Sequence, residues 1–430
     1  MTKRRKRANP WRVIVLMVLV GGALYVNQNI IPNTQPLFIP TVTPTRSPES
    51  FITDAEALVG QGKLVPAIGA YRLAIQANPK NGSLYVTTAR LMVYTANYKE
   101  AVTMAENALL INPNNGLAHG VRGWALTYLE DYLPAEAAIK KSLELDPNNG
   151  EVYAYYAQLL ALQNQAGQGT LGSLDKAVEA SRKAITLSPN SLETHRARGL
   201  VLEMTSNYAE AAKEFESAIT INGNISDLHL SLGRNYRALQ QYDKAVEEFN
   251  RANALNPSDP MANTYISRTY AAVGEYAKAI QFAQQAVKVS SVDPFLYGNL
   301  GTMYYRNKQY KDAVTTLRVS VRGGKSDDGK SVVGLPLDYG RVAEYYYLYG
   351  LALARNRECG EALELSQVIQ QGVINDETAV YNAGQIIEIC KDVSKSGIPT
   401  SETSQPAETN TTIPETTLTP QPPANETPAP

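Results

Sequence analysis

Three histidines are the side chains in this sequence best suited to acid–base or metal chemistry. They are His119, His195 and His229, and each falls at the same place in a pattern that repeats along the chain. Other copies of the pattern carry tyrosine at this place. A metal site or a proton-transfer site needs its groups gathered at one point. We therefore expect these histidines to pack helices, and we predict no catalytic residue and no metal site.

A second candidate is the segment from Gly324 to Ser331, which fits the phosphate-loop pattern G-x(4)-G-K-[ST]. In a working site this loop joins a buried strand to a helix, and amide groups of the loop hold the phosphate. Here a helical pattern runs up to Arg322, and Pro336 follows too soon for a second helix. We expect a polar insertion loop, with no nucleotide or other cofactor.

The two cysteines, Cys359 and Cys390, lack the spacing of a metal site. Outside the cytoplasm an even number of cysteines can pair. Two readings stay open: a disulfide that clamps the C-terminal end of the chain, or two buried thiols.

The elements that carry these residues recur every 34 residues, with one step of 42. Turn pairs such as Asn78-Pro79 and Asn112-Pro113 mark the end of each copy, because proline cannot continue a helix. One position of each copy is always alanine: Ala67, Ala101, Ala135, Ala177, Ala211, Ala245, Ala279, Ala313 and Ala362. Another is always small: Ala55, Ala89, Gly123, Ala157, Gly199, Gly233, Ser267, Gly301 and Gly350. Since helices approach closely only where side chains lack bulk, we expect pairs of antiparallel helices.

This pattern resembles the tetratricopeptide repeat, which places a small residue, a tyrosine, an alanine and a proline at these positions. The resemblance implies an all-α, right-handed superhelical solenoid of about nine helix-turn-helix repeats. It places the array at residues 48–392, with insertions near 164–173 and 322–340. A last amphipathic helix at 376–391 is expected to cap the C-terminal end.

The resemblance also implies that the first helix of each repeat lines a concave face that binds a partner. Arginine and aromatic residues fall on the positions of this face: Arg90, Trp124, Arg196, Arg234, Arg237, Arg268, Tyr305 and Arg306. Guanidinium groups bind carboxylates through paired hydrogen bonds, so we expect a protein or acidic peptide ligand. The alternative is internal pairing with Glu193, Glu203 and Asp227, which are assigned to the same face. The family's carboxylate-clamp pattern of lysine and asparagine is not reproduced here.

The N-terminal region carries a basic cluster within residues 1–12, followed by an apolar segment. Residues 13–31 reach spanning length only when the polar residues 27–29 lie at the far interface. The basic cluster favours an N-terminus inside the cell. We expect a single-pass signal-anchor helix in the cell membrane, with the array outside the cytoplasm. A cleaved signal peptide and a buried core helix are the alternatives.

Two further segments have the composition of linkers. Residues 32–47 are rich in proline and threonine and predict an extended spacer. Residues 393–430 are rich in threonine, proline and glutamate and predict a disordered tail.

The charge balance limits the classes of partner. The chain has 40 lysines and arginines against 41 aspartates and glutamates, so we expect no nucleic acid partner. The expected function is a membrane-anchored extracytoplasmic scaffold, not an enzyme, that binds a protein through its concave face. The alternatives are a structural spacer at the cell surface or envelope, and a non-catalytic subunit of an envelope enzyme or assembly complex.

Overall fold

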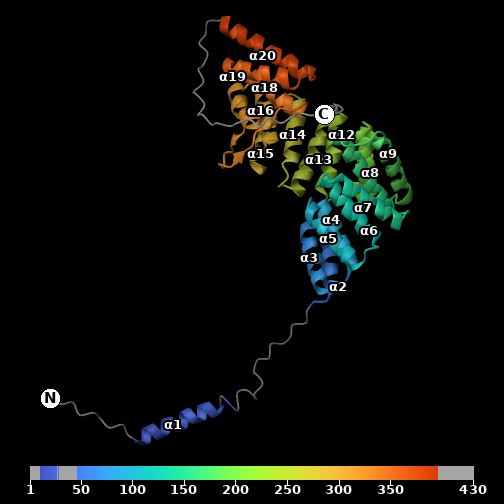
Figure 1. Cartoon of the computed structure of the whole chain (residues 1–430), viewed down its shortest axis with the longest axis vertical. Coiled ribbons are helices and arrows are strands. Elements are labelled where there is room, and N and C mark those ends of the chain that lie inside the picture. Colours follow the sequence, from blue (N-terminus) through green and yellow to red (C-terminus); the bar gives the residue numbers. More distant parts are fainter. Residues whose placement is uncertain (1–9, 27, 29–45, 396–430) are drawn as a thin grey trace, which may run out of the picture. The chain divides into compact units, whose positions relative to one another are not determined.

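The structure is a computed structural model that describes residues 10–26, 28 and 46–395. The chain divides into two compact units, one ending at Ser47 and one beginning at Pro48. The described part of the first unit holds helix α1 (Pro10–Tyr25), and the second unit holds a helical array (Figure 1).

Helix α1 corrects the predicted membrane anchor. It has 16 residues, which at 1.5 Å per residue amounts to about 24 Å, against a hydrocarbon layer of roughly 30 Å. Among the residues that the structure describes, no helix is both long enough and apolar enough to cross a membrane. The predicted signal-anchor at 13–31, and the cell-membrane location with an extracytoplasmic array that depended on it, are therefore wrong. Residues 27 and 29–31, which that prediction included, lie outside the described residues, as do 32–45 and 396–430.

Residues 48–395 of the second unit form nine antiparallel helix pairs and a last single helix, so the prediction of an all-α solenoid is confirmed. The first five pairs are α2 (Pro48–Gly60) with α3 (Leu64–Ala77), α4 (Gly82–Tyr94) with α5 (Tyr98–Ile111), α6 (Gly116–Tyr128) with α7 (Tyr132–Leu145), α8 (Gly150–Gln165) with α9 (Ser173–Leu187), and α10 (Leu192–Met204) with α11 (Tyr208–Ile221). The next four are α12 (Ser226–Ala238) with α13 (Tyr242–Leu255), α14 (Met261–Ala272) with α15 (Tyr276–Val289), α16 (Pro294–Arg306) with α17 (Tyr310–Arg322), and α18 (Arg341–Arg355) with α19 (Cys359–Gly372). Helix α20 (Glu377–Lys395) packs on α18 and α19 and ends the array.

The small residues set how closely the two helices of a pair approach. A Cβ atom added at Gly233 would come within 2.5 Å of the Phe249 ring, and one at Gly301 would come within 2.5 Å of the Leu317 side chain. Each small residue of the first helix therefore makes room for a large side chain of the second. The alanine of the second helix, such as Ala245, is fully buried beside it.

The turns between paired helices repeat the same backbone geometry. In eight of the pairs one turn residue has a positive φ, and only two of these eight are glycine. They are Gly62, Ala96, Glu130, Ser206, Gln240, Gly274, Lys308 and Arg357. The residue ends the first helix in the left-handed conformation and lets the chain reverse.

The insertion at 322–340 contains the only strands in the described part of the chain. Strand β1 (Gly324–Lys325) pairs antiparallel with β2 (Ser331–Val332). This hairpin replaces the strand-to-helix turn that a phosphate loop requires, and no helix follows it until Arg341. Lys330 is paired with Asp328 of its own turn, at 2.7 Å.

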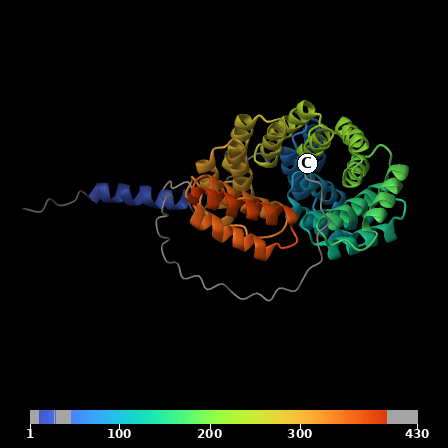
Figure 2. The same ribbon diagram turned by 90° about the horizontal axis from the view of Figure 1, so that it is seen from above.

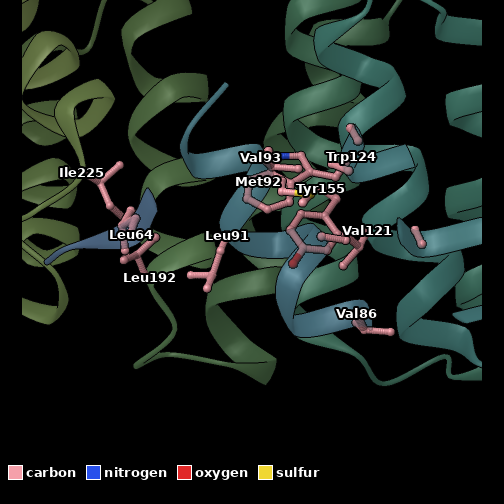
Figure 3. Close-up of a cluster of buried hydrophobic side chains, with 14 of the residues drawn as sticks. Leu64, Val86, Leu91, Met92, Val93, Val121, Trp124, Tyr155, Leu192 and Ile225 are labelled. Carbon is pink, nitrogen blue, oxygen red and sulfur yellow. The ribbon is translucent and has the colours of Figure 1, made fainter. Parts of the chain in front are cut away.

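The array curves because its first helices pack against one another. Helices α4, α6, α8, α10, α12, α14, α16 and α18 each contact the next in this series, while the second helices lie on the outside. Figure 2 shows the resulting bend. In the N-terminal half the bend brings the first pair to the turn before α12, where Leu64 joins one buried cluster with Leu192 and Ile225 (Figure 3).

Candidate functional site

Arg90, on α4, lines a cavity of about 320 Å³, but the bend of the array brings α10 against it and supplies carboxylate partners from within the chain. Its guanidinium binds the carboxylate of Glu193, which lies 103 residues further along the chain, and approaches Glu151 at 3.3 Å. Tyr94 and Ser191 donate hydrogen bonds to the same Glu193 carboxylate. Burial favours a raised pKa for Glu193, but Arg90 and these hydroxyl groups outweigh burial, so the pKa lies below its ordinary value.

Arg196 and Trp124 form a second internal cluster, and neither offers surface to a ligand. The Arg196 guanidinium binds Asp227 and also donates to the Gln158 side chain at 2.9 Å. Trp124 is fully buried; it stacks on Tyr155 and donates its Nε1–H to Gln158. The expected place of Trp124 on the partner-binding face is wrong, because the neighbouring helices α4 and α8 cover its ring.

Arg234 is also paired within the array. Its Nε and Nη2 atoms donate to the two carboxylate oxygens of Glu203, at 2.8 and 3.0 Å. Three of the predicted groove arginines, Arg90, Arg196 and Arg234, thus follow the alternative of internal pairing.

The remaining groove arginines converge on one cavity of about 420 Å³ in the C-terminal half of the array. Arg237 of α12, Arg268 of α14, Arg306 of α16 and Arg341 of α18 line it, together with one acidic side chain, Glu344. We call this cavity the arginine pocket. Four positive side chains against one negative leave three positive charges in excess.

Arg237 is the unusual member of the arginine pocket. Its residue is only 6 % exposed, and its Nε is buried with no hydrogen-bond partner. Among the described residues its guanidinium has no ion pair, and only the Tyr265 ring lies over it, at 5.8 Å. Burial and the charge of Arg268 lower the pKa of Arg237 to about 10, so it still carries its charge near neutral pH.

The other three arginines differ in their hydrogen-bond and ion-pair partners. Arg268 donates to the amide oxygen of Asn299 at 3.1 Å, and burial followed by the charge of Arg341 lowers its pKa. Arg341 donates to Glu344 at 2.9 Å, and Arg306 reaches the same carboxylate only at 3.9 Å. Glu344 therefore pairs with the outer two arginines, and among the residues that the structure describes no carboxylate forms an ion pair with Arg237 or Arg268.

Arg341 is the pocket residue that the sequence patterns missed. It lies directly after the irregular insertion, where the repeat numbering breaks. Tyr305 is half-buried beside Tyr310 and does not line the pocket, whereas its neighbour Arg306 does.

The histidines lie apart from the arginine pocket. His195 bonds Glu214 at 2.7 Å, and His229 bonds Glu248 at 2.6 Å, in equivalent places of successive repeats. His119 contacts the Pro113 carbonyl oxygen at 3.0 Å. Among the described residues, no three or more histidine, cysteine and acidic side chains are grouped so that they could hold a metal ion.

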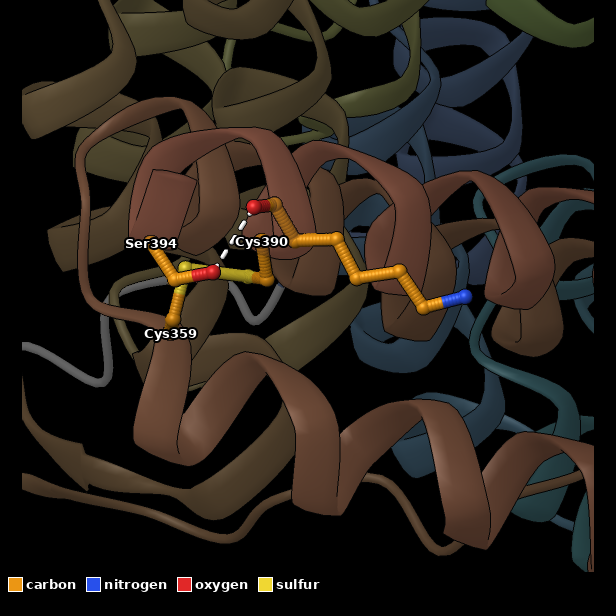
Figure 4. The surroundings of a disulfide bond; sticks show 4 residues. Cys359, Cys390 and Ser394 are labelled. Atoms are coloured by element: carbon orange, nitrogen blue, oxygen red, sulfur yellow. Dashed lines mark hydrogen bonds between the residues drawn. A yellow bond between two sulfur atoms is a disulfide. The ribbon is translucent and has the colours of Figure 1, made fainter. Parts of the chain in front are cut away.

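Cys359 and Cys390 form a disulfide between the start of α19 and the last helix (Figure 4). The bond closes a stretch of 31 residues. Beyond it, Ser394 donates to the Lys391 carbonyl oxygen at 2.7 Å and continues the helix. The disulfide thus ties α20 to the array.

Stacked antiparallel helix pairs with a concave inner face define an α-solenoid. Family models described as tetratricopeptide repeat match residues 118–149 with 168–191, 138–170 and 230–294. These stretches of the chain are therefore similar to the tetratricopeptide repeat.

Similar solved structures include a thermophilic TPR protein from Thermus thermophilus, at 18 % identity and a TM-score of 0.38, covering 44 % of this chain and 98 % of that one. A tetratricopeptide repeat protein from Parabacteroides merdae matches at 17 % identity and a TM-score of 0.37, covering 60 % of this chain and 99 % of that one. A comparison with curated proteins finds no match.

Proposed function

We propose that this protein is a non-catalytic scaffold that binds another protein, and that the arginine pocket receives an acidic segment of that partner. The observation that carries the proposal is the buried Nε of Arg237, which has no hydrogen-bond partner among the described residues. A buried charge without a partner is costly, and native structures keep one chiefly where a ligand completes it.

The distribution of ion pairs over the concave face supports the same reading. Arg90, Arg196 and Arg234 already have carboxylate partners within the chain. Arg237 and Arg268 have none among the described residues, and they lie in a cavity that can admit a side chain. Solenoids of this kind present extended concave surfaces to their partners.

The test uses a short fluorescent Glu-rich peptide and the full chain, with binding followed by fluorescence anisotropy at low salt. The chain should bind this peptide and should not bind a Lys-rich peptide of the same length. Arg268→Glu should weaken binding about 100-fold, because it places a carboxylate where the ligand's carboxylate lies.

Arg251→Glu is the matched control. It makes the same change of charge on α13, where Arg251 is half exposed and pairs with Glu247 of its own helix. Equal losses in the two variants would show that only net charge matters. Failure of the unaltered chain to bind the acidic peptide would contradict the proposal.

A further inference from the structure

We propose that the arginine pocket recognises a phosphoryl dianion carried on a side chain of the partner's segment. This inference rests on the proposed function and specifies its ligand.

Two of the four arginines in the pocket already have an acidic partner. Glu344 bonds Arg341 and lies near Arg306, so the outer two arginines share one carboxylate. Arg237 and Arg268 are the inner two, and neither has an acidic partner among the described residues. The two inner arginines therefore carry two positive charges that no carboxylate of the described residues balances.

A partner protein can offer two kinds of anionic side chain, a carboxylate or a phosphorylated residue. A carboxylate brings one charge and two oxygens, and it would leave one inner arginine unmatched. A phosphorylated side chain brings a charge of about −1.5 to −2 and three acceptor oxygens near neutral pH. Two guanidinium groups on adjacent first helices can each donate paired hydrogen bonds to such a group.

The position of the pocket in the array indicates whether the anion is free or attached to a peptide. The four arginines belong to the first helices of four successive repeats, so the pocket lies along the concave surface and not at an end of the array. Asn299, Thr302 and Gln240 line the same cavity and can bond to a peptide on either side of the anion. This setting suits an anion attached to an extended segment more than a free one.

The experiment uses three synthetic peptides that differ at one central position, which is serine, glutamate or phosphoserine, and isothermal titration with the full chain. The phosphoserine peptide should bind about tenfold more tightly than the glutamate peptide. The serine peptide should bind most weakly. Free inorganic phosphate should bind at least about 100-fold more weakly than the phosphoserine peptide, because it lacks the flanking contacts.

The pH dependence separates the dianion from other sources of affinity. The phosphoryl group loses its second proton at a pKa of about 6, so the ratio of phosphoserine to glutamate affinity should rise from pH 5 to pH 7.5. The charged and titratable groups that line the cavity face both peptides, and their own titration acts on both. They are Arg237, Arg268, Arg306, Arg341, Glu344, Tyr242 and Tyr345.

Arg237→Met should reduce the tenfold preference to about twofold or less, because one of the two inner charges is gone. Arg268→Gln tests the other inner charge without depending on how Arg237→Met folds. Arg251→Met, on the outer helix α13, should leave the preference unchanged.

Each outcome decides between the two proposals. Equal affinity for the glutamate and phosphoserine peptides, or a preference that both inner variants keep, overturns the phosphoryl inference and leaves the acidic-segment function standing. Inorganic phosphate that binds as tightly as the phosphoserine peptide overturns the attachment to a segment. If neither acidic peptide binds the unaltered chain, the proposed function itself fails.

Discussion

The two halves of the concave face use the same residue type in opposite ways. In the N-terminal half, the bend of the array brings Glu193 against Arg90, and the arginine becomes part of the structure. In the C-terminal half, Arg237 and Arg268 line a cavity on the same face, and no carboxylate in the described part of the chain forms an ion pair with them. An arginine on a concave repeat face is therefore structural or available according to what the curvature places opposite it.

The largest effect is expected from removing the acidic partner in the closed half. Glu193→Ala removes the buried carboxylate of the pair and leaves the partly exposed Arg90 with only Glu151 nearby, at 3.3 Å. Breaking a buried ion pair from one side costs about 3–5 kcal/mol of unfolding free energy. Trp124 is fully buried in this half and reports its unfolding in urea by fluorescence. The matched change Glu247→Ala, at an exposed pair on α13, should have little effect. If Glu193→Ala lowered the unfolding free energy by less than about 1 kcal/mol, the ion pair between Arg90 and Glu193 would contribute no more than an ion pair on the surface.

The N-terminal half is stabilised by the ion pair between Arg90 and Glu193, whereas the end of the C-terminal half is stabilised by a disulfide. Cys390→Ser removes the bond between α19 and α20 and should cost about 3 kcal/mol, because the unfolded chain is no longer constrained. Hydrogen exchange should accelerate in α20 and α19 and stay unchanged around Trp124. Chemical reduction of the unaltered chain is the second arm and should give the same pattern. Faster exchange throughout the array would mean that the two halves unfold as one unit.

The sequence predicts the contacts that are local to one repeat, but not the contacts between residues far apart along the chain. The small residues such as Gly233 and the paired helices are local features, and the repeat pattern predicts them. The assignment of arginines to the concave face is also local. Which arginine finds a carboxylate is not local, because Arg90 meets Glu193 only through the accumulated bend of three repeats. The covering of Trp124 by neighbouring helices and the convergence of Arg341 on Arg237 escape the pattern for the same reason.

The third expected effect is smaller and has the opposite sign. Arg237→Met replaces a buried charge, whose Nε has no hydrogen-bond partner among the described residues, with an apolar chain of similar length, so it should raise stability by about 1–2 kcal/mol while it weakens binding of the phosphoserine peptide. The measurement is thermal unfolding followed by circular dichroism. Arg234→Met, one turn earlier on α12, should lower stability instead, because it leaves Glu203 without its bidentate partner. Destabilisation by Arg237→Met would indicate a partner for this guanidinium, and the distinction between the two halves would fail there.

Acidification should give the smallest effect, and it should act on the closed half in two directions. The folded pKa of Glu151 is raised, by burial and then by the charge of Glu193. The folded chain therefore holds this proton more tightly than the unfolded chain, and stability rises as pH falls through the folded pKa of Glu151.

The folded pKa of Glu193 is lowered, so its contribution is present above the unfolded value of about 4.3 and is lost as pH falls below that value. Trp124 fluorescence in urea should thus show a small gain in stability in mild acid, followed by a loss at lower pH. Glu151→Gln should abolish the gain and keep the loss, and Glu193→Gln should abolish the loss. If the unfolding free energy of the unaltered chain instead fell steadily as the pH was lowered, with no initial gain, the pKa of Glu151 would not be raised. The arrangement of the Glu151 and Glu193 carboxylates around Arg90 would then be contradicted.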